Sequence, residues 1–137
     1  MAGRAAGLSP ASEAEMSELL TWLRVPPGST LKVTLEPVNG EFTSTGQVFR
    51  FGGRRKADEQ WSDADIRPGP KKLSLKSSTD YVVDVLVTFV GGTKATASVR
   101  ASVLKADGSL HGRPRKADLS GAKGDPPDSV TIVLITT

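Results

Sequence analysis

Two short basic segments carry the residue types that are best suited to bind a ligand in this sequence. The phrase GGRRKAD at 52–58 returns as HGRPRKAD at 111–118, in stretches whose Gly, Pro and charge content predicts loops. Arginine has a planar guanidinium fork that pairs well with phosphate or carboxylate oxygens. The sequence therefore offers one set of candidate binding residues: Arg54, Arg55, Lys56, Arg113, Arg115 and Lys116.

Acidic residues follow both basic phrases and leave a second interpretation open. The acids after the first phrase are Asp58, Glu59, Asp63 and Asp65, and those after the second are Asp118 and Asp125. Local charge then nearly cancels, as is common in solvated surface loops that bind nothing. The basic phrases are thus either a binding surface or ordinary exposed loops.

Catalytic chemistry has few candidates, because the chain has one histidine and no cysteine. That histidine, His111, stands beside a Gly-Arg-Pro turn, a setting more typical of a surface residue than of a catalytic triad. No Gly-x-Ser-x-Gly elbow, P-loop or His-Glu-x-x-His pattern occurs. We therefore expect no catalytic residue, no metal site and no cofactor.

The two tryptophans are the remaining candidate binding residues. Trp61 precedes Asp63 and Asp65 in WSDADIRPGP and could stack on a sugar ring. An isolated aromatic in a long loop more often anchors that loop by packing, which is the alternative interpretation. Trp22 lies beside the apolar stripe of a predicted helix, where it either widens the stripe or projects toward a protein partner.

An amphipathic helix is predicted near the N-terminus. Ser12 and Glu15 have the spacing of a capping box. Four apolar residues then share one helical face: Met16, Leu19, Leu20 and Leu23. A Pro-Pro-Gly run would end the helix. We expect a flexible N-terminal segment at 1–11 and a short helix at 12–24.

Apolar and polar residues alternate along most of the chain after Gly28, which is the pattern of half-buried strands. Turn signals separate the alternating stretches at Asn39-Gly40, Gly91-Gly92 and Asp107-Gly108. The pattern predicts a mainly β fold, an antiparallel β-sandwich of the Ig-like or jelly-roll-like kind with about six to seven strands. Residues 12–137 would form this single domain together with the helix.

The order of the turns predicts where the basic phrases lie. If consecutive strands run antiparallel, each connection switches ends of the body. Asn39-Gly40 would then lie at one end, and both basic phrases would lie at the other end with Gly91-Gly92 and Lys94. We therefore expect Arg54 and Arg113 to approach one another.

Charge and hydropathy narrow the function classes. The 137 residues carry a net charge of +3, too weak to indicate a dedicated nucleic-acid binder by itself. No apolar run approaches the length of a membrane span, and the N-terminus lacks a signal-peptide core. We expect no membrane partner and a cytoplasmic or particle-associated location.

These observations favour a non-enzymatic structural, assembly or recognition module that acts within a larger protein complex or particle. Its partners would be proteins, including copies of itself in a homo-oligomer. The alternative is a module that binds an anionic polymer, either nucleic acid or a sulfated glycan, through the paired basic loops. Steep weakening by salt would separate polymer binding from an apolar assembly interface.

Overall fold

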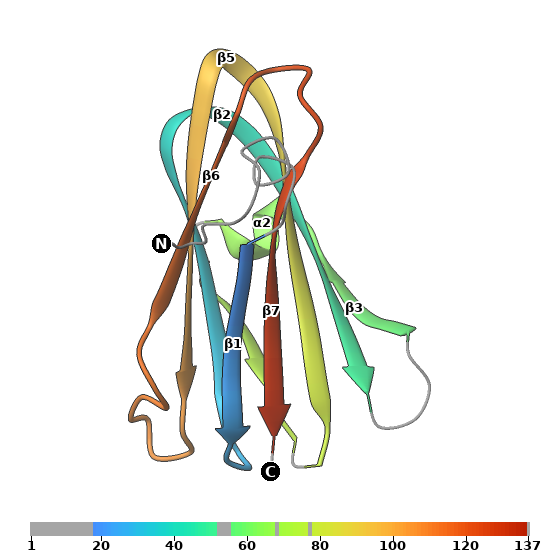
Figure 1. Cartoon of the computed structure of the whole chain (residues 1–137), viewed down its shortest axis with the longest axis vertical. Helices are drawn as coiled ribbons and strands as arrows, with labels where there is room; N and C mark the ends of the chain where they lie inside the picture. Colours follow the sequence, from blue (N-terminus) through green and yellow to red (C-terminus); the bar gives the residue numbers. More distant parts are fainter. Residues whose placement is uncertain (1–17, 52–55, 68, 77, 137) are drawn as a thin grey trace, which may run out of the picture.

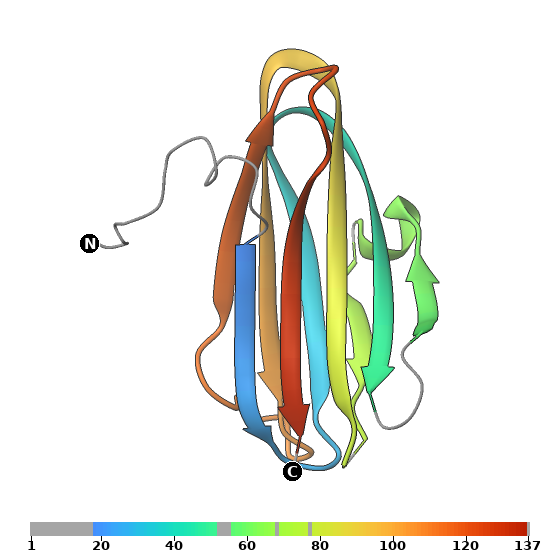
Figure 2. The same ribbon diagram turned by 45° about the vertical axis from the view of Figure 1, so that its right-hand side comes forward.

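The strands of this chain belong to one hydrogen-bonded sheet that curls into a nearly closed, barrel-like body (Figures 1 and 2). The computed structural model describes residues 18–51, 56–67, 69–76 and 78–136. Within them, the elements are β1 (Glu18–Val25), β2 (Thr30–Phe51), β3 (Lys56–Trp61), α2 (Asp63–Ile66), β4 (Lys71–Ser74), β5 (Asp80–Leu104), β6 (Arg115–Gly121) and β7 (Asp128–Thr136). The predicted mainly β fold is therefore confirmed.

Two very long strands form the frame of the sheet. β2 has 22 residues and β5 has 25, and the two pair antiparallel along almost their whole length. Both strands fold over at the top of Figure 1, at Gly40 and at Gly91-Gly92, where the pairing register shifts. Gly40 has φ 75°, and a Cβ atom there would lie 2.5 Å from the Ala95 Cβ. The bend thus needs a residue without a side chain.

The fold-over places each half of β2 and β5 in a different wall. The front wall contains β1, β7, the first half of β5, the second half of β2, and β3; the back wall contains β6, the second half of β5, the first half of β2, and β4. Because β2 and β5 continue from wall to wall, the two walls are parts of one sheet. An Ig-like or jelly-roll-like sandwich is not seen as such, and that finer assignment stays a prediction.

The predicted turns at Asn39-Gly40 and Gly91-Gly92 are wrong as hairpins. A hairpin would pair the two halves of β2 with each other, whereas both halves pair with β5. Glu41 lies opposite Gly91, so the two glycine bends meet at the same end of the body instead of at opposite ends. The prediction of which end each turn lies at was wrong because it treated both bends as strand ends, whereas neither bend interrupts its strand.

The alternating apolar residues point into the body, as the sequence predicted. Leu31, Val33, Tyr81, Val99 and Ile132 are all fully buried. Their polar neighbours along each strand, apart from the buried Ser98, are half-buried or exposed on the outer surface. One core therefore fills the space between the two walls.

The predicted N-terminal helix is wrong for residues 18–24, which belong to β1 and run parallel to β7. Residues 12–17 of that prediction, and the segment 1–11, lie outside the described residues. Leu20 is buried while Leu19 and Leu23 are 62% and 61% exposed, so the burial follows a period of two. The ladder with β7 supplies the backbone hydrogen bonds that a helix would otherwise make internally. Among the described residues, no helix has the length and apolarity that a membrane crossing needs.

Candidate functional site

The two basic phrases begin strands in different walls. Arg54 and Arg55 lie outside the described residues, and of Lys56 only the backbone is described, at the start of β3 in the front wall. Arg115 and Lys116 begin β6 in the back wall. The predicted approach of Arg54 to Arg113 therefore stays a prediction.

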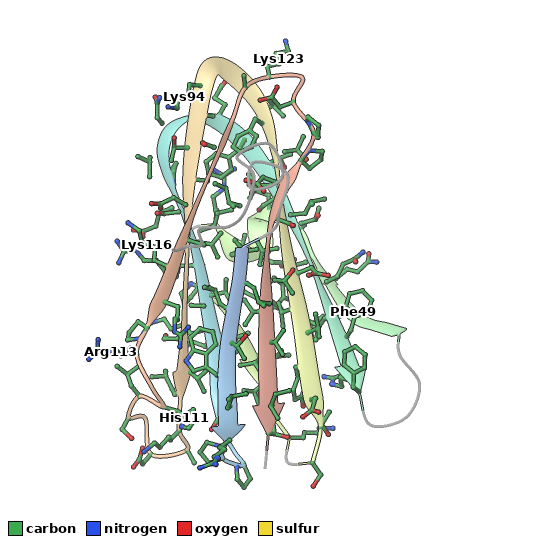
Figure 3. The ribbon with its side chains drawn as sticks, viewed as in Figure 1. Phe49, Lys94, His111, Arg113, Lys116 and Lys123 are labelled. Carbon is green, nitrogen blue, oxygen red and sulfur yellow. The ribbon has the colours of Figure 1, made fainter. Side chains whose placement is uncertain are left out.

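The second basic phrase does not gather at the end that carries the glycine bends. Figure 3 shows Lys94 near the bends, Lys116 lower along β6, and Arg113 lower still, close to His111. The pairing agrees, because Ala95 lies opposite Gly121 while Ala101 lies opposite Arg115. The expectation that Lys94 and Gly91-Gly92 join these arginines is wrong.

Four cations lie instead across the outer surface of the back wall, one on each of its strands. Lys72 of β4 lies directly opposite Lys32 of β2. Thr34 of β2 lies opposite Arg100 of β5, which in turn lies opposite Lys116 of β6. Residues in direct register share a face of the sheet, so all four cations point outward. We call this set, Lys72, Lys32, Arg100 and Lys116, the basic face.

Among the described residues, acids neutralise two of these four cations. Arg100 forms an ion pair with Glu36, and Lys116 lies 3.7 Å from Asp118. Across the described part of the chain, neither Lys32 nor Lys72 has an acidic partner. Like charges directly opposite one another destabilise a sheet. Repulsion between Lys32 and Lys72 therefore lowers the stability of the sheet, and a bound anion would reduce this repulsion.

A shallow hollow of about 200 Å³ lies beside this pair. Its lining includes two of the cations and two hydroxyl groups, from Lys32, Arg100, Thr34 and Ser102, together with Ala101 and Pro114. Ammonium, guanidinium and hydroxyl groups all donate hydrogen bonds. The hollow is thus suited to a phosphate or sulfate group.

Arg115 and His111 have a structural position at the gap between β1 and the residues that lead into β6. The guanidinium carbon of Arg115 lies 5.5 Å from the centroid of the Trp22 ring. His111 Nε2 lies 2.8 Å from the Leu23 carbonyl oxygen. Trp22 is 3% exposed and packs into the core, so it offers no surface to a partner. These contacts close one side of the barrel-like body.

Trp61 closes the other side by packing. It is 3% exposed, and its ring lies against Gly46 of β2. Its Nε1 donates to Glu59 at 2.8 Å, and Glu59 also pairs with Lys71 of β4 at 2.9 Å. The Lys71 hydrogen bond is the main reason that the pKa of Glu59 lies below its ordinary value of 4.5. Trp61 thus anchors its segment by packing, and its buried ring is not available to stack on a sugar.

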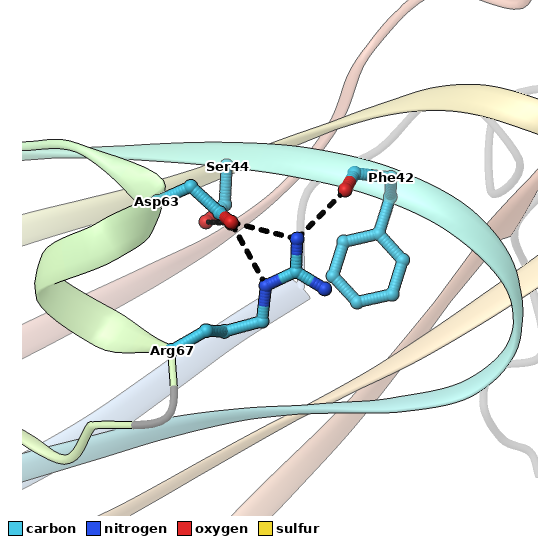
Figure 4. A network of polar contacts seen from close by, with 4 residues as sticks. All are labelled: Phe42, Ser44, Asp63 and Arg67. Carbon is cyan, nitrogen blue, oxygen red and sulfur yellow. Dashed lines mark hydrogen bonds and ion pairs between the residues drawn. The ribbon is translucent and has the colours of Figure 1, made fainter.

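Asp63 and Asp65 also have structural partners. Arg67 makes a bidentate pair with Asp63 and donates to the Phe42 carbonyl, and Ser44 donates to Asp63 at 2.7 Å (Figure 4). Burial raises the pKa of Asp63, but the bonds from Arg67 and Ser44 outweigh it and leave the pKa below its ordinary value. Asp65 accepts from the Ser62 backbone and caps the helix α2.

Sequence reasoning missed Lys32, Lys72 and Arg100 as site residues. Each stands at an outward position of an alternating strand, which gives no sign of what lies across from it. Within the described ranges, no three His, Asp or Glu side chains are grouped so as to hold a metal ion. No family model matches this chain, and no curated protein or solved structure is significantly similar to it.

Proposed function

We propose that this protein is a non-enzymatic recognition module that binds an anionic polymer across the basic face. The observation that carries the proposal is the Lys32–Lys72 pair, two like charges in direct register without an acidic partner among the described residues. Arg100 and Lys116 extend the positive charge over the next two strands. This replaces the paired basic loops with a sheet surface as the binding element.

The width of the basic face favours a chain of anions over a single one. Adjacent strands lie about 4.8 Å apart and each residue adds about 3.3 Å along a strand, so three strand intervals and a two-residue offset separate Lys72 from Lys116 by roughly 16 Å. One phosphate or sulfate group cannot contact both ends of such a row. A polymer with repeated anionic groups can bridge it.

The chemistry of the face predicts binding to the polymer backbone without base recognition. The outward positions of the second half of β5 are Thr96, Ser98, Arg100 and Ser102, which provide no aromatic surface for stacking. Contacts of this kind are electrostatic, and their strength falls steeply with salt. Nucleic acid and sulfated glycan share this chemistry, so both are used as probes.

The test compares two double variants with matched charge. Lys32→Thr/Lys72→Thr removes the unneutralised pair, and Lys105→Thr/Lys123→Thr removes two exposed lysines away from the basic face. Fluorescence anisotropy measures the binding of labelled single-stranded DNA and of a labelled heparin fragment at rising salt. We expect the first variant to lower the salt slope for DNA by about 1.4, two contacts at about 0.7 each.

An equal loss of binding in the two double variants would show that only net charge matters and would overturn the proposal. So would a wild-type protein that retains neither probe at low salt. Binding of the heparin fragment alone would assign the function to sulfated glycan, and binding of both probes would assign it to polyanions in general.

Assembly into a larger complex or particle is the second candidate function. β1 pairs with β7 along one edge only, and its outward Leu19 and Leu23 are about three-fifths exposed. Exposed apolar side chains on an edge strand favour pairing with another chain. We propose a second copy of this chain as the partner. The test is the native mass of the wild type and of the Leu19→Lys/Leu23→Lys variant. A monomeric wild type would refute the proposal, and so would a variant that is still oligomeric.

A further inference from the structure

The front wall carries a second hollow, on the side of the body opposite the basic face. It measures about 390 Å³ and is lined by Thr45, Gln47, Asp84, Leu86, Ser129 and Thr131. None of these side chains takes part in the basic face or in the contacts that close the two sides of the body. The hollow is therefore an independent candidate site.

Six side chains in register build this hollow. Gln47, Asp84 and Thr131 lie opposite one another across β2, β5 and β7. The next outward rung repeats the arrangement with Thr45, Leu86 and Ser129. The short side chains of Thr45 and Ser129 flank the longer Leu86, and the short Thr131 lies beside Asp84. Three neighbouring strands hold the polar groups in fixed positions.

Asp84 is the chemical centre of the hollow. Thr131 Oγ1 donates to Asp84 Oδ1 at 2.8 Å, which orients the carboxylate. No ion pair of Asp84 is found among the described residues. An ionised carboxylate accepts several hydrogen bonds, so Oδ2 and the second lone pair of Oδ1 can still accept. Asp84 therefore suits a ligand that presents paired hydroxyl donors.

The remaining lining selects against anionic ligands. No lysine or arginine of the described residues lines the hollow, so nothing there favours an anion. Gln47 and the hydroxyl groups both donate and accept, which matches the dual capacity of a sugar hydroxyl. Leu86 is 40% exposed and provides an apolar contact for the C–H groups of a sugar ring.

An aromatic side chain flanks the polar rungs. Phe49 follows Gln47 by two residues on the same outward face of β2, and lies opposite Val82 of β5. Figure 3 shows its position at the margin of the front wall, beside β3. Aromatic rings combine a large apolar face with rigid geometry, which suits contact with the apolar side of a sugar.

We propose that this hollow binds a neutral carbohydrate, with Asp84 and Gln47 holding a pair of adjacent hydroxyl groups and Leu86 packing against the ring. The site shares no residue with the basic face, lies on the other wall, and binds a neutral ligand instead of an anion. It goes beyond the proposed function, and neither binding event requires the other.

The test is a titration of the ¹⁵N-labelled protein with three neutral probes: cellopentaose, maltopentaose and triacetylchitotriose. At least one probe should shift the backbone amides of the hollow, at 45–47, 84–86 and 129–131. The Asp84→Asn variant keeps the acceptor for Thr131 but loses the charge and one acceptor, and we expect about tenfold weaker binding, or about 1.4 kcal/mol. Thr88→Ala, on the same face outside the hollow, is the matched control.

Gln47→Ala provides a second variant, because Gln47 is exposed and its truncation leaves the core intact. Unchanged binding in both Asp84→Asn and Gln47→Ala would overturn the proposal, as would three probes that shift no amide of the hollow. The Lys32→Thr/Lys72→Thr protein should bind the neutral probe as the wild type does. Loss of that binding would place the carbohydrate on the basic face instead.

Discussion

The guanidinium carbon of Arg67 lies 4.2 Å from the centroid of the Phe42 ring, and Nη2 of the same side chain donates to the Phe42 carbonyl at 2.8 Å (Figure 4). One cation thus contacts both the ring and the backbone of a residue beside the bend of β2. Its remaining bonds go to Asp63 at the start of α2. Arg67 therefore joins α2 to the bent part of the frame.

Replacement of Arg67 tests this connection. Arg67→Ala leaves Asp63 without its bidentate partner, and we expect the free energy of unfolding to fall by about 1–3 kcal/mol. Arg67→Lys should recover only part of this, since an ammonium group lacks the planar fork. Urea unfolding followed by circular dichroism measures both, with the exposed Arg113→Ala as the control. Full stability of Arg67→Lys would contradict the bidentate geometry.

The ion pair between Lys71 and Glu59 predicts that the stability of the fold depends on pH. The pKa of Glu59 is lower in the folded protein, mainly through the Lys71 hydrogen bond. The stabilisation is therefore complete above the ordinary value of 4.5 and is lost as the pH falls through the lowered pKa. Carboxyl ¹³C titration should show that Lys71→Met raises the pKa of Glu59. Lys72→Met, one residue further and pointing outward, should leave that pKa unchanged.

The contact between Gly46 and Trp61 predicts an intolerant position in β2. A Cβ atom at Gly46 would lie 2.3 Å from Cε3 of Trp61, so an added methyl group must displace the indole. We expect Gly46→Ala to cost about 1–3 kcal/mol of stability by overpacking. Tryptophan fluorescence during denaturation reports the change, and Thr43→Ala is the exposed control. In a Trp61→Leu background, Gly46→Ala should lower the free energy of unfolding by less than it does in the wild type. An equal loss in both backgrounds would contradict the contact.

Single truncations in β1 distinguish a strand from a helix. In the strand, Leu20 is buried and Leu19 and Leu23 are exposed, so Leu20→Ala should cost about 2–5 kcal/mol. Leu19→Ala and Leu23→Ala should each change stability by less than about 0.5 kcal/mol. A helix would bury all three leucines on one face. Comparable losses at the three positions in thermal unfolding would therefore contradict β1.

Local alternation made most of the β structure predictable. Residues such as Val33 and Val83 face the core because a strand turns successive side chains to opposite sides, and this follows from the sequence alone. The same rule misled at β1, because ELLTWLRV satisfies a period of two and a helical spacing together. Pairing with β7, more than 100 residues away by the register of Leu20 with Ile132, selected the strand.

The candidate sites were less predictable than the strands. The sequence singled out Trp61 and Trp22, whose rings are buried. It grouped the cations of the two basic phrases because they are adjacent along the chain. It contained Lys32 and Lys72 as ordinary outward positions. Nothing local indicates that residues 40 positions apart lie in direct register.

By itself, the sequence determined that this chain forms β structure, which side chains enter the core, and that catalytic groups are scarce. Tertiary structure decided the rest: that β2 and β5 pass through Gly40 and Gly91 without ending, that β1 is a strand, and which polar side chains share a surface. The reason is physical. Burial follows a short-range periodicity of the backbone, whereas register and neighbourhood depend on hydrogen bonds between strands that are distant in the chain.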